Sequence, residues 1–140
     1  MAGVTFDAGG LIALDRDDRR VVVLLARASE TGAPVTVPAS ALAQAIRRPE
    51  RQARLSRLVR QPTTRVTGLD RVDATSVGRL LAASGTSDIA DAHVVICARR
   101  AGQPVVTSDP GDLSKLDPTL TLIVVLRAGP REGRYQARQR

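Results

Sequence analysis

The chain has 140 residues, of which 43% are hydrophobic and 25% are charged, so it can form one domain with a buried core and is not disordered as a whole. No apolar run approaches the ~18 residues of a membrane-spanning helix, and the amino terminus lacks a signal-peptide pattern. The single cysteine fits a reducing compartment. We therefore expect a cytoplasmic protein without membrane contact. The net charge is +7, because 21 basic residues, all but Lys115 arginine, outnumber 14 acidic ones, and this excess favours a polyanionic partner.

The first half of the chain alternates short apolar strands with helical segments. Gly9 and Gly10 allow a tight turn after the first strand, and Pro38 suits the first turn of a helix. The β-branched run that begins at Val21 also fits a strand, but we favour a helix because the next strand signal follows so soon. The predicted elements are a strand at 3–6, helices at 11–14 and 19–30, a strand at 34–37, helices at 38–48 and 50–61, and a strand at 65–69.

The second half continues the alternation. Gly85 and Gly102 are typical helix ends, and Pro110 with Gly111 indicates a turn. The predicted elements are helices at 70–84 and 88–101, a strand at 104–107, a short helix at 112–116 and a strand at 120–126. We therefore expect one domain over residues 1–126, followed by a flexible basic tail over 127–140 that holds five arginines and one glutamate.

Alternating strands and helices predict an α/β protein with a parallel sheet that is covered on both faces. In such sheets, ligands bind at the carboxyl ends of the strands, near the point where the strand order reverses. Asp7 follows the first strand, Asp109 follows the fourth, and Asp91 lies in the first turn of the helix that leads to the fourth strand. We therefore expect these three carboxylates to meet at one edge. Because carboxylates repel each other, such a group needs a compensating cation or raised pKa values.

Three segments carry a resemblance to a known family. They are Val-Thr-Phe-Asp at 4–7 with Gly-Leu-Ile-Ala at 10–13, Asp-Ala-His-Val-Val-Ile-Cys-Ala at 91–98, and Val-Val-Thr-Ser-Asp-Pro-Gly-Asp-Leu at 105–113. In order and spacing they resemble the PIN-domain family of metal-dependent nucleases over residues 3–126, especially the toxins of bacterial VapBC toxin–antitoxin pairs. The resemblance implies a three-layer α/β/α fold around a five-stranded, mainly parallel sheet, and endoribonuclease activity.

The resemblance also implies a set of site residues. The acidic metal ligands and catalytic residues of the family match Asp7, Asp91 and Asp109, with Asp112 as an accessory carboxylate. Asp88 is a further candidate from its own position, three residues before Asp91 on nearly the same helix face, where the helix dipole also favours an aspartate. The remaining family position is usually glutamate, and here it holds Gln44, whose amide oxygen can bind a metal or a water but brings no negative charge. This departure predicts reduced activity.

The chemistry explains why the family needs carboxylates. Mg²⁺ or Mn²⁺ neutralises the charge that develops on a phosphodiester during cleavage, and both ions prefer oxygen ligands. The chain offers no set of histidines and cysteines with zinc spacing; His93 is interpreted as a surface or packing residue and Cys97 as a core residue. The resemblance further implies an RNA substrate, a cognate antitoxin protein and a homodimer.

Other features leave alternatives open. Arg48, Arg51 and Arg54 belong to a series of arginines at every third position, which indicates either RNA contact or a solvated helix face. Gln44 and the basic charge also fit a PIN-like RNA-binding or regulatory protein with little catalysis. A phosphoryl-transfer protein is disfavoured because Gly9 stands where its motif usually has a second aspartate.

Overall fold

The computed structural model describes residues 2–125, and the predicted basic tail lies outside them. All five predicted strands are present, although the last is shorter than predicted and has three residues. They are short and lie in the expected order along the chain: β1 (Val4–Phe6), β2 (Val35–Pro38), β3 (Thr64–Thr67), β4 (Val105–Thr107) and β5 (Leu122–Val124).

Helical segments fill the intervals between the strands. They are α1 (Ala8–Asp15), α2 (Arg19–Thr31), α3 (Ala39–Ala45), the short 3₁₀ helix η1 (Pro49–Arg51), α4 (Ala53–Val59), α5 (Arg71–Ser84), α6 (Ile89–Ala101) and α7 (Pro110–Leu116).

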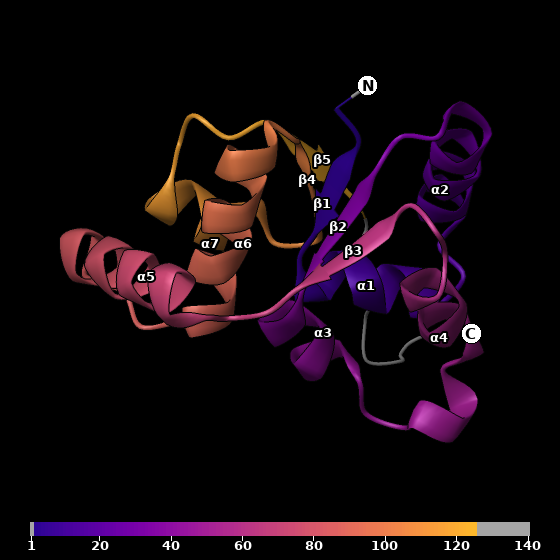
Figure 1. Ribbon diagram of the computed structural model, residues 1–140, viewed down its shortest axis with the longest axis horizontal. Coiled ribbons are helices and arrows are strands. Elements are labelled where there is room, and N and C mark those ends of the chain that lie inside the picture. Colours follow the sequence, from indigo (N-terminus) through magenta and orange to yellow (C-terminus); the bar gives the residue numbers. More distant parts are fainter. Residues whose placement is uncertain (1, 126–140) are drawn as a thin grey trace, which may run out of the picture.

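The strands form one sheet in the order β3-β2-β1-β4-β5. All four strand pairings are parallel, so the sheet is fully rather than mainly parallel. Helices α1, α2 and α4 lie on one side of the sheet and α5, α6 and α7 on the other, with α6 against β1 and β2 (Figure 1). This confirms the predicted three-layer α/β/α architecture. The strand order reverses between β1 and β4, which places the switch point of the fold there.

The core follows from the apolar strands. β1 and β4 are buried at every residue, as expected for the central strands of a sheet with helices on both faces. Helix α6 buries Ala92, Val94, Val95 and Ala98, and α1 buries Leu11 and Leu14 from the opposite side. Removal of this apolar surface from water is the main favourable term in folding.

The ambiguous β-branched run is helical, as predicted. Asp18 begins α2, since its carboxylate accepts hydrogen bonds from the backbone N–H groups of Arg20 and Val21 at 2.9 and 3.3 Å. Gly32 ends the helix in the left-handed conformation, with φ of 72°. Arg20 also donates a hydrogen bond from Nη1 to the carbonyl oxygen of Val124 on β5, at 2.8 Å.

The predicted helices at 38–48 and 50–61 were wrong in extent. The first ends at Ala45, and the second is divided into η1 and α4. The cause is Gln52, a buried side chain whose Oε1 accepts from the backbone N–H groups of Arg47 and Arg48 at 2.9 and 3.0 Å. Its Nε2 donates to the carbonyl of Ala45 at 2.9 Å. These bonds replace the helical ones that the intervening backbone would otherwise make.

Two glycines allow α1 to begin directly against β4. A Cβ at Gly9 would lie 2.3 Å from Oγ of Ser108, and a Cβ at Gly10 would lie 2.4 Å from the carbonyl oxygen of Val106. Any other residue would force the helix away from the strand. The glycine pair therefore sets the distance between the segments that follow β1 and β4.

Among residues 2–125, no single helix is both long and apolar enough to cross a membrane, and α5 with α6 satisfies those criteria only as a pair bent by 111°.

The glycine contact can be tested by substitution. Gly10→Ala is expected to destabilise the protein by roughly 1–3 kcal/mol, because the new methyl group meets a backbone carbonyl that cannot rotate away. Gly78→Ala is the matched control: Gly78 lies inside α5 with no atom near its missing Cβ, so the change is expected to stabilise by about 0.5–1 kcal/mol. Urea denaturation of both variants measures the difference. An unchanged stability of Gly10→Ala would show that α1 moves freely relative to β4.

Candidate functional site

The switch point of the sheet collects carboxylates from separate segments. Asp7 follows β1 and Asp109 lies two residues after β4, and these strands are neighbours in the sheet. Helices α1 and α3 lie at this edge in Figure 1. Because β1 and β4 are parallel neighbours, Asp7 and Asp109 lie at the same edge of the sheet.

Asp7 is buried, at 4% exposure, and caps α1. Its Oδ1 accepts from the backbone N–H of Gly10 at 2.8 Å. Burial raises the pKa of Asp7, and the charge of Asp109 adds to the rise, while hydrogen bonds from Thr107, Gly10 and Gly9 oppose it. A carboxylate that is buried, held by hydrogen bonds and close to a second carboxylate is stabilised by a bound cation.

Thr107 links the two strand ends. Its fully buried hydroxyl donates to the carboxylate of Asp7 and accepts from the backbone N–H of Asp109 at 3.0 Å. The side chain therefore fixes Asp7 relative to the turn that carries Asp109. It acts as a positioning residue for both carboxylates.

The start of α6 supplies two more carboxylates. Asp88 caps the helix and accepts from the backbone N–H of Asp91 at 2.9 Å. Asp91 is half-buried, and burial raises its pKa to about 7, with further contributions from the charges of Asp88, Asp7, Asp112 and Asp109, in that order. The charges of all four other aspartates of the group therefore act on Asp91.

These side chains surround one cleft of about 360 Å³. It brings together all six residues that sequence reasoning placed at the metal site, from the loop after β1, from α3, from the start of α6 and from the segment after β4. Other lining residues were not foreseen at the site, among them Arg16 at the end of α1. The lining residues are Asp7, Gly9, Ile12, Arg16, Gln44, Asp88, Asp91, Ser108, Asp109 and Asp112.

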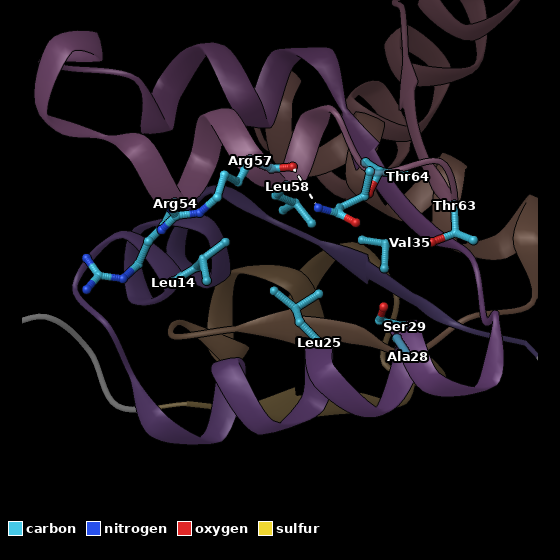
Figure 2. Close-up of a pocket in the computed structure, with 11 residues that line it drawn as sticks. Leu14, Leu25, Ala28, Ser29, Val35, Arg54, Arg57, Leu58, Thr63 and Thr64 are labelled. Carbon is cyan, nitrogen blue, oxygen red and sulfur yellow. Dashed lines mark hydrogen bonds between the residues drawn. The ribbon is translucent and has the colours of Figure 1, made fainter.

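Arg48, Arg51 and Arg54 do not line this cleft. The break between η1 and α4 separates them, so they do not wind around one helix as the sequence spacing indicated. Arg54 forms an ion pair with Asp17 at 3.4 Å and lies at a different hollow, of about 260 Å³. Figure 2 shows that hollow, where Leu14, Leu25 and Leu58 of three helices surround an apolar space.

The acidic cleft has the donor set of a site for hard divalent cations. Its potential ligands are carboxylate oxygens and the amide oxygen of Gln44, and Mg²⁺ and Mn²⁺ prefer such oxygens over nitrogen or sulfur. Burial, and after it repulsion from the neighbouring carboxylates, raises the pKa of Asp91, and a bound cation would relieve that repulsion. The residues present therefore fit a magnesium or manganese ion.

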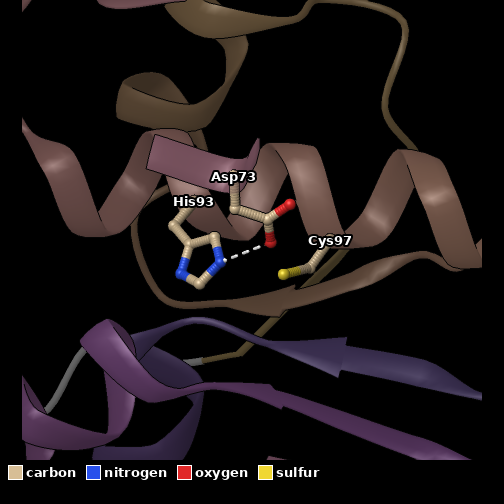
Figure 3. A group of neighbouring side chains, drawn as sticks. All are labelled: Asp73, His93 and Cys97. Carbon is tan, nitrogen blue, oxygen red and sulfur yellow. Dashed lines mark hydrogen bonds and ion pairs between the residues drawn. The ribbon is translucent and has the colours of Figure 1, made fainter. Parts of the chain in front are cut away.

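A second group could also hold a metal ion. Asp73 of α5 and His93 and Cys97 of α6 are buried, and their ligand atoms lie within 4.8 Å of one another. Figure 3 shows the three side chains pointing toward one another between the two helices. Nitrogen, sulfur and oxygen donors together suit zinc rather than magnesium.

Two of the three residues, Asp73 and His93, also belong to a hydrogen-bonded network. His93 Nε2 lies 3.0 Å from Oδ2 of Asp73, and Nδ1 lies 3.4 Å from Oγ of Ser40, while Arg100 pairs with the other oxygen of Asp73. Burial raises the pKa of Asp73, but the bonds from Arg100 and His93 outweigh it, so the pKa lies below its usual value. Burial and the Asp73 charge raise the pKa of Cys97 to about 11, so metal binding would require this thiol to lose its proton.

Sequence reasoning missed this group for two reasons. Cys97 lies four residues after His93, and this helical spacing places both side chains on one face of α6, a pairing that the search for zinc spacing overlooked. Asp73 was not among the candidate site residues, because the sequence alone does not show that Asp70 caps α5 while Asp73 is buried. The pairing of α5 with α6 is tertiary information that spacing alone does not contain.

A comparison with protein-family models and with curated proteins finds no match for the chain.

The raised pKa of Asp91 predicts a pH-dependent stability. The folded pKa exceeds that of the unfolded chain, so the metal-free protein loses stability as the pH rises from about 4 to about 7. Asp91→Asn removes this penalty, and its stabilising effect is expected to be roughly 1–3 kcal/mol larger at pH 8 than at pH 4.5, after allowance for solvent screening. Denaturation in chelator at both pH values measures it. A pH-independent effect would contradict the crowding of charges.

The Asp73 network predicts a large cost for its removal. Asp73→Ala leaves Arg100 and His93 without their partner, and the expected destabilisation is roughly 3–5 kcal/mol. Asp70→Ala on the same helix removes only a cap and is expected to cost about 1 kcal/mol. Urea denaturation with and without chelator separates the hydrogen bonds from a bound ion. Loss of wild-type stability in chelator would assign the stabilisation to a metal instead.

Proposed function

We propose that the chain is a metal-dependent endoribonuclease of the PIN-domain kind, which hydrolyses RNA phosphodiester bonds as the toxin of a toxin–antitoxin pair. One observation carries the proposal: aspartates from three separate segments, together with Gln44, converge on one cleft at the switch point of a fully parallel sheet. The convergence occurs in a chain whose net charge is +7, so it is not a by-product of an acidic composition.

The chemistry assigned to the cleft needs a cation. When bound, Mg²⁺ or Mn²⁺ supplies Lewis-acid stabilisation of the negative charge on the reacting phosphate. Asp7, Asp91 and Asp109 would hold it, with Asp112 and Asp88 at the exposed rim. Thr107 keeps Asp7 and the Asp109 turn at a fixed separation, which lowers the cost of assembling the site.

Gln44 has a distinct role in this proposal. It extends from α3 into the same cleft and is exposed, so its amide oxygen can take a ligand position or hold a water. Since it brings no charge, the site is less negative than one with glutamate, and it binds the cation less strongly. We therefore propose a weaker metal affinity than four carboxylates around the cation would give.

The partners proposed with this activity are single-stranded RNA, a protein antitoxin that blocks the cleft, and a second copy of the chain. The strongly basic charge supports a polyanionic substrate. Phe6 is buried in the core, so it is not available for base stacking. This favours recognition through phosphates.

A second candidate is a PIN-like RNA-binding or regulatory protein with little catalysis. Gln44 in the cleft favours it, because loss of one ligand charge weakens cation binding without removing the affinity for RNA. The two candidates differ in whether Mn²⁺ makes the protein cut RNA.

The test compares wild type, Asp91→Asn and Gln44→Glu on a panel of fluorescent single-stranded RNAs with Mg²⁺, Mn²⁺ or chelator. We expect metal-dependent cleavage by wild type, a loss of about 10²-fold or more in Asp91→Asn, and a lower Mn²⁺ requirement in Gln44→Glu. Calorimetry measures Mn²⁺ affinity in the same proteins.

Three outcomes separate the candidates. Cleavage that requires metal and Asp91 supports the nuclease. RNA binding without cleavage, unchanged in Asp91→Asn and in Gln44→Glu, favours the regulatory protein. Failure of the folded wild type to bind Mn²⁺ would remove the basis of the nuclease proposal.

A further inference from the structure

The acidic cleft continues into a neighbouring hollow. This second space, of about 260 Å³, is bounded by Asp88, Asp91 and Asp112, the same three carboxylates that form one wall of the cleft. Its other lining residues come from the α5–α6 loop and from α7: Thr86, Ser87, Lys115 and Leu116. The two spaces therefore adjoin at these three carboxylates, and we refer to them together as the channel.

The charges along this channel follow a pattern. Arg16, at the carboxyl end of α1, lines the cleft. Asp88, Asp91 and Asp112 line both spaces and lie where the two meet. Lys115 lines the neighbouring hollow, together with the hydroxyl-bearing Thr86 and Ser87. The order is thus cation, carboxylates, cation, and both cationic side chains are exposed to solvent.

This order matches the backbone of a nucleic-acid strand rather than a small anion. A strand presents a phosphate at each nucleotide, so a phosphate placed at the carboxylates has neighbours on both sides. Those neighbours would be repelled by the aspartates and attracted by Arg16 and Lys115. Thr86 and Ser87 add hydroxyl groups that can donate to phosphate oxygens.

We propose that Arg16 and Lys115 bind the phosphates that flank the reacting phosphate, and that this channel, not the arginine series at 48–60, sets the path of the RNA strand. The inference rests on the proposed function and deepens it by naming its substrate-binding residues. Because these contacts go to the backbone, they hold RNA without reading its sequence.

The experiment measures RNA binding and metal binding separately. Fluorescence anisotropy of a labelled oligouridine, with Ca²⁺ in place of Mg²⁺ to slow cleavage, gives the affinity of wild type, Arg16→Gln and Lys115→Gln. The control is Arg79→Gln, which removes the same charge from an exposed position of α5 outside both spaces. Lys115→Arg tests whether charge alone suffices.

We expect the two substitutions to weaken RNA binding without weakening Mn²⁺ binding. Arg16→Gln and Lys115→Gln each weaken RNA binding about three- to tenfold, and each lowers the slope of log affinity against log salt by about 0.7. Mn²⁺ affinity, measured by calorimetry, stays equal or rises slightly, because a nearby positive charge has been removed. Lys115→Arg retains RNA binding, and Arg79→Gln changes neither quantity beyond a general charge effect.

The outcomes separate this inference from the proposed function. If wild type binds RNA but both variants keep its affinity and salt slope, or lose no more than Arg79→Gln, the channel assignment is overturned while the nuclease proposal stands. If the variants lose RNA and Mn²⁺ binding together, the residues support the fold and do not contact RNA, which also overturns the assignment. If folded wild type neither binds nor cuts RNA with metal present, the proposed function is contradicted, and the channel assignment that rests on it is overturned as well.

Discussion

The amino end of α1 lies against the carboxyl end of β4 with no room for a side chain between them. Gly9 lies against the side chain of Ser108, and Gly10 lies against the backbone of Val106. The same contact brings the cap of α1, Asp7, beside the turn that carries Asp109. A displacement of this helix by the width of a methyl group would strain the bond from the Gly10 N–H that fixes the Asp7 carboxylate. The chemistry of the cleft thus depends on a packing constraint in the backbone.

Two groups of buried carboxylates in this protein are stabilised in opposite ways. Asp73 has a guanidinium and an imidazole as partners, and its pKa falls below the ordinary value despite complete burial. Asp91 is half-buried among other carboxylates, and burial together with their charges raises its pKa to about 7. The first arrangement is complete within the protein. The second becomes favourable when a cation is added, which is the physical difference between a side chain that holds helices together and one that is available for a ligand.

Much of the fold could be predicted from the sequence because its signals are local. Helix ends such as Gly85 and Gly102, and apolar runs such as 104–107, specify where elements begin and end. The division of the 50–61 helix could not be foreseen, because it depends on where the Gln52 side chain finds its partners. The carboxylates of the cleft were predictable from topology, since the carboxyl ends of parallel strands meet. Arg16 and Lys115 were not, because a solvent-exposed cation carries no sequence signal of what it faces.

The hydrogen bond from Arg20 to Val124 has a consequence for self-association. β5 is an outer strand of the sheet, and such strands present unpaired backbone groups that can recruit a strand from another molecule. Here the strand has only three residues, and a guanidinium occupies the carbonyl oxygen of its last one. A second chain that paired along this edge would have to displace that bond and approach a positive charge. Arg20 thereby hinders the addition of a further strand at this end of β5.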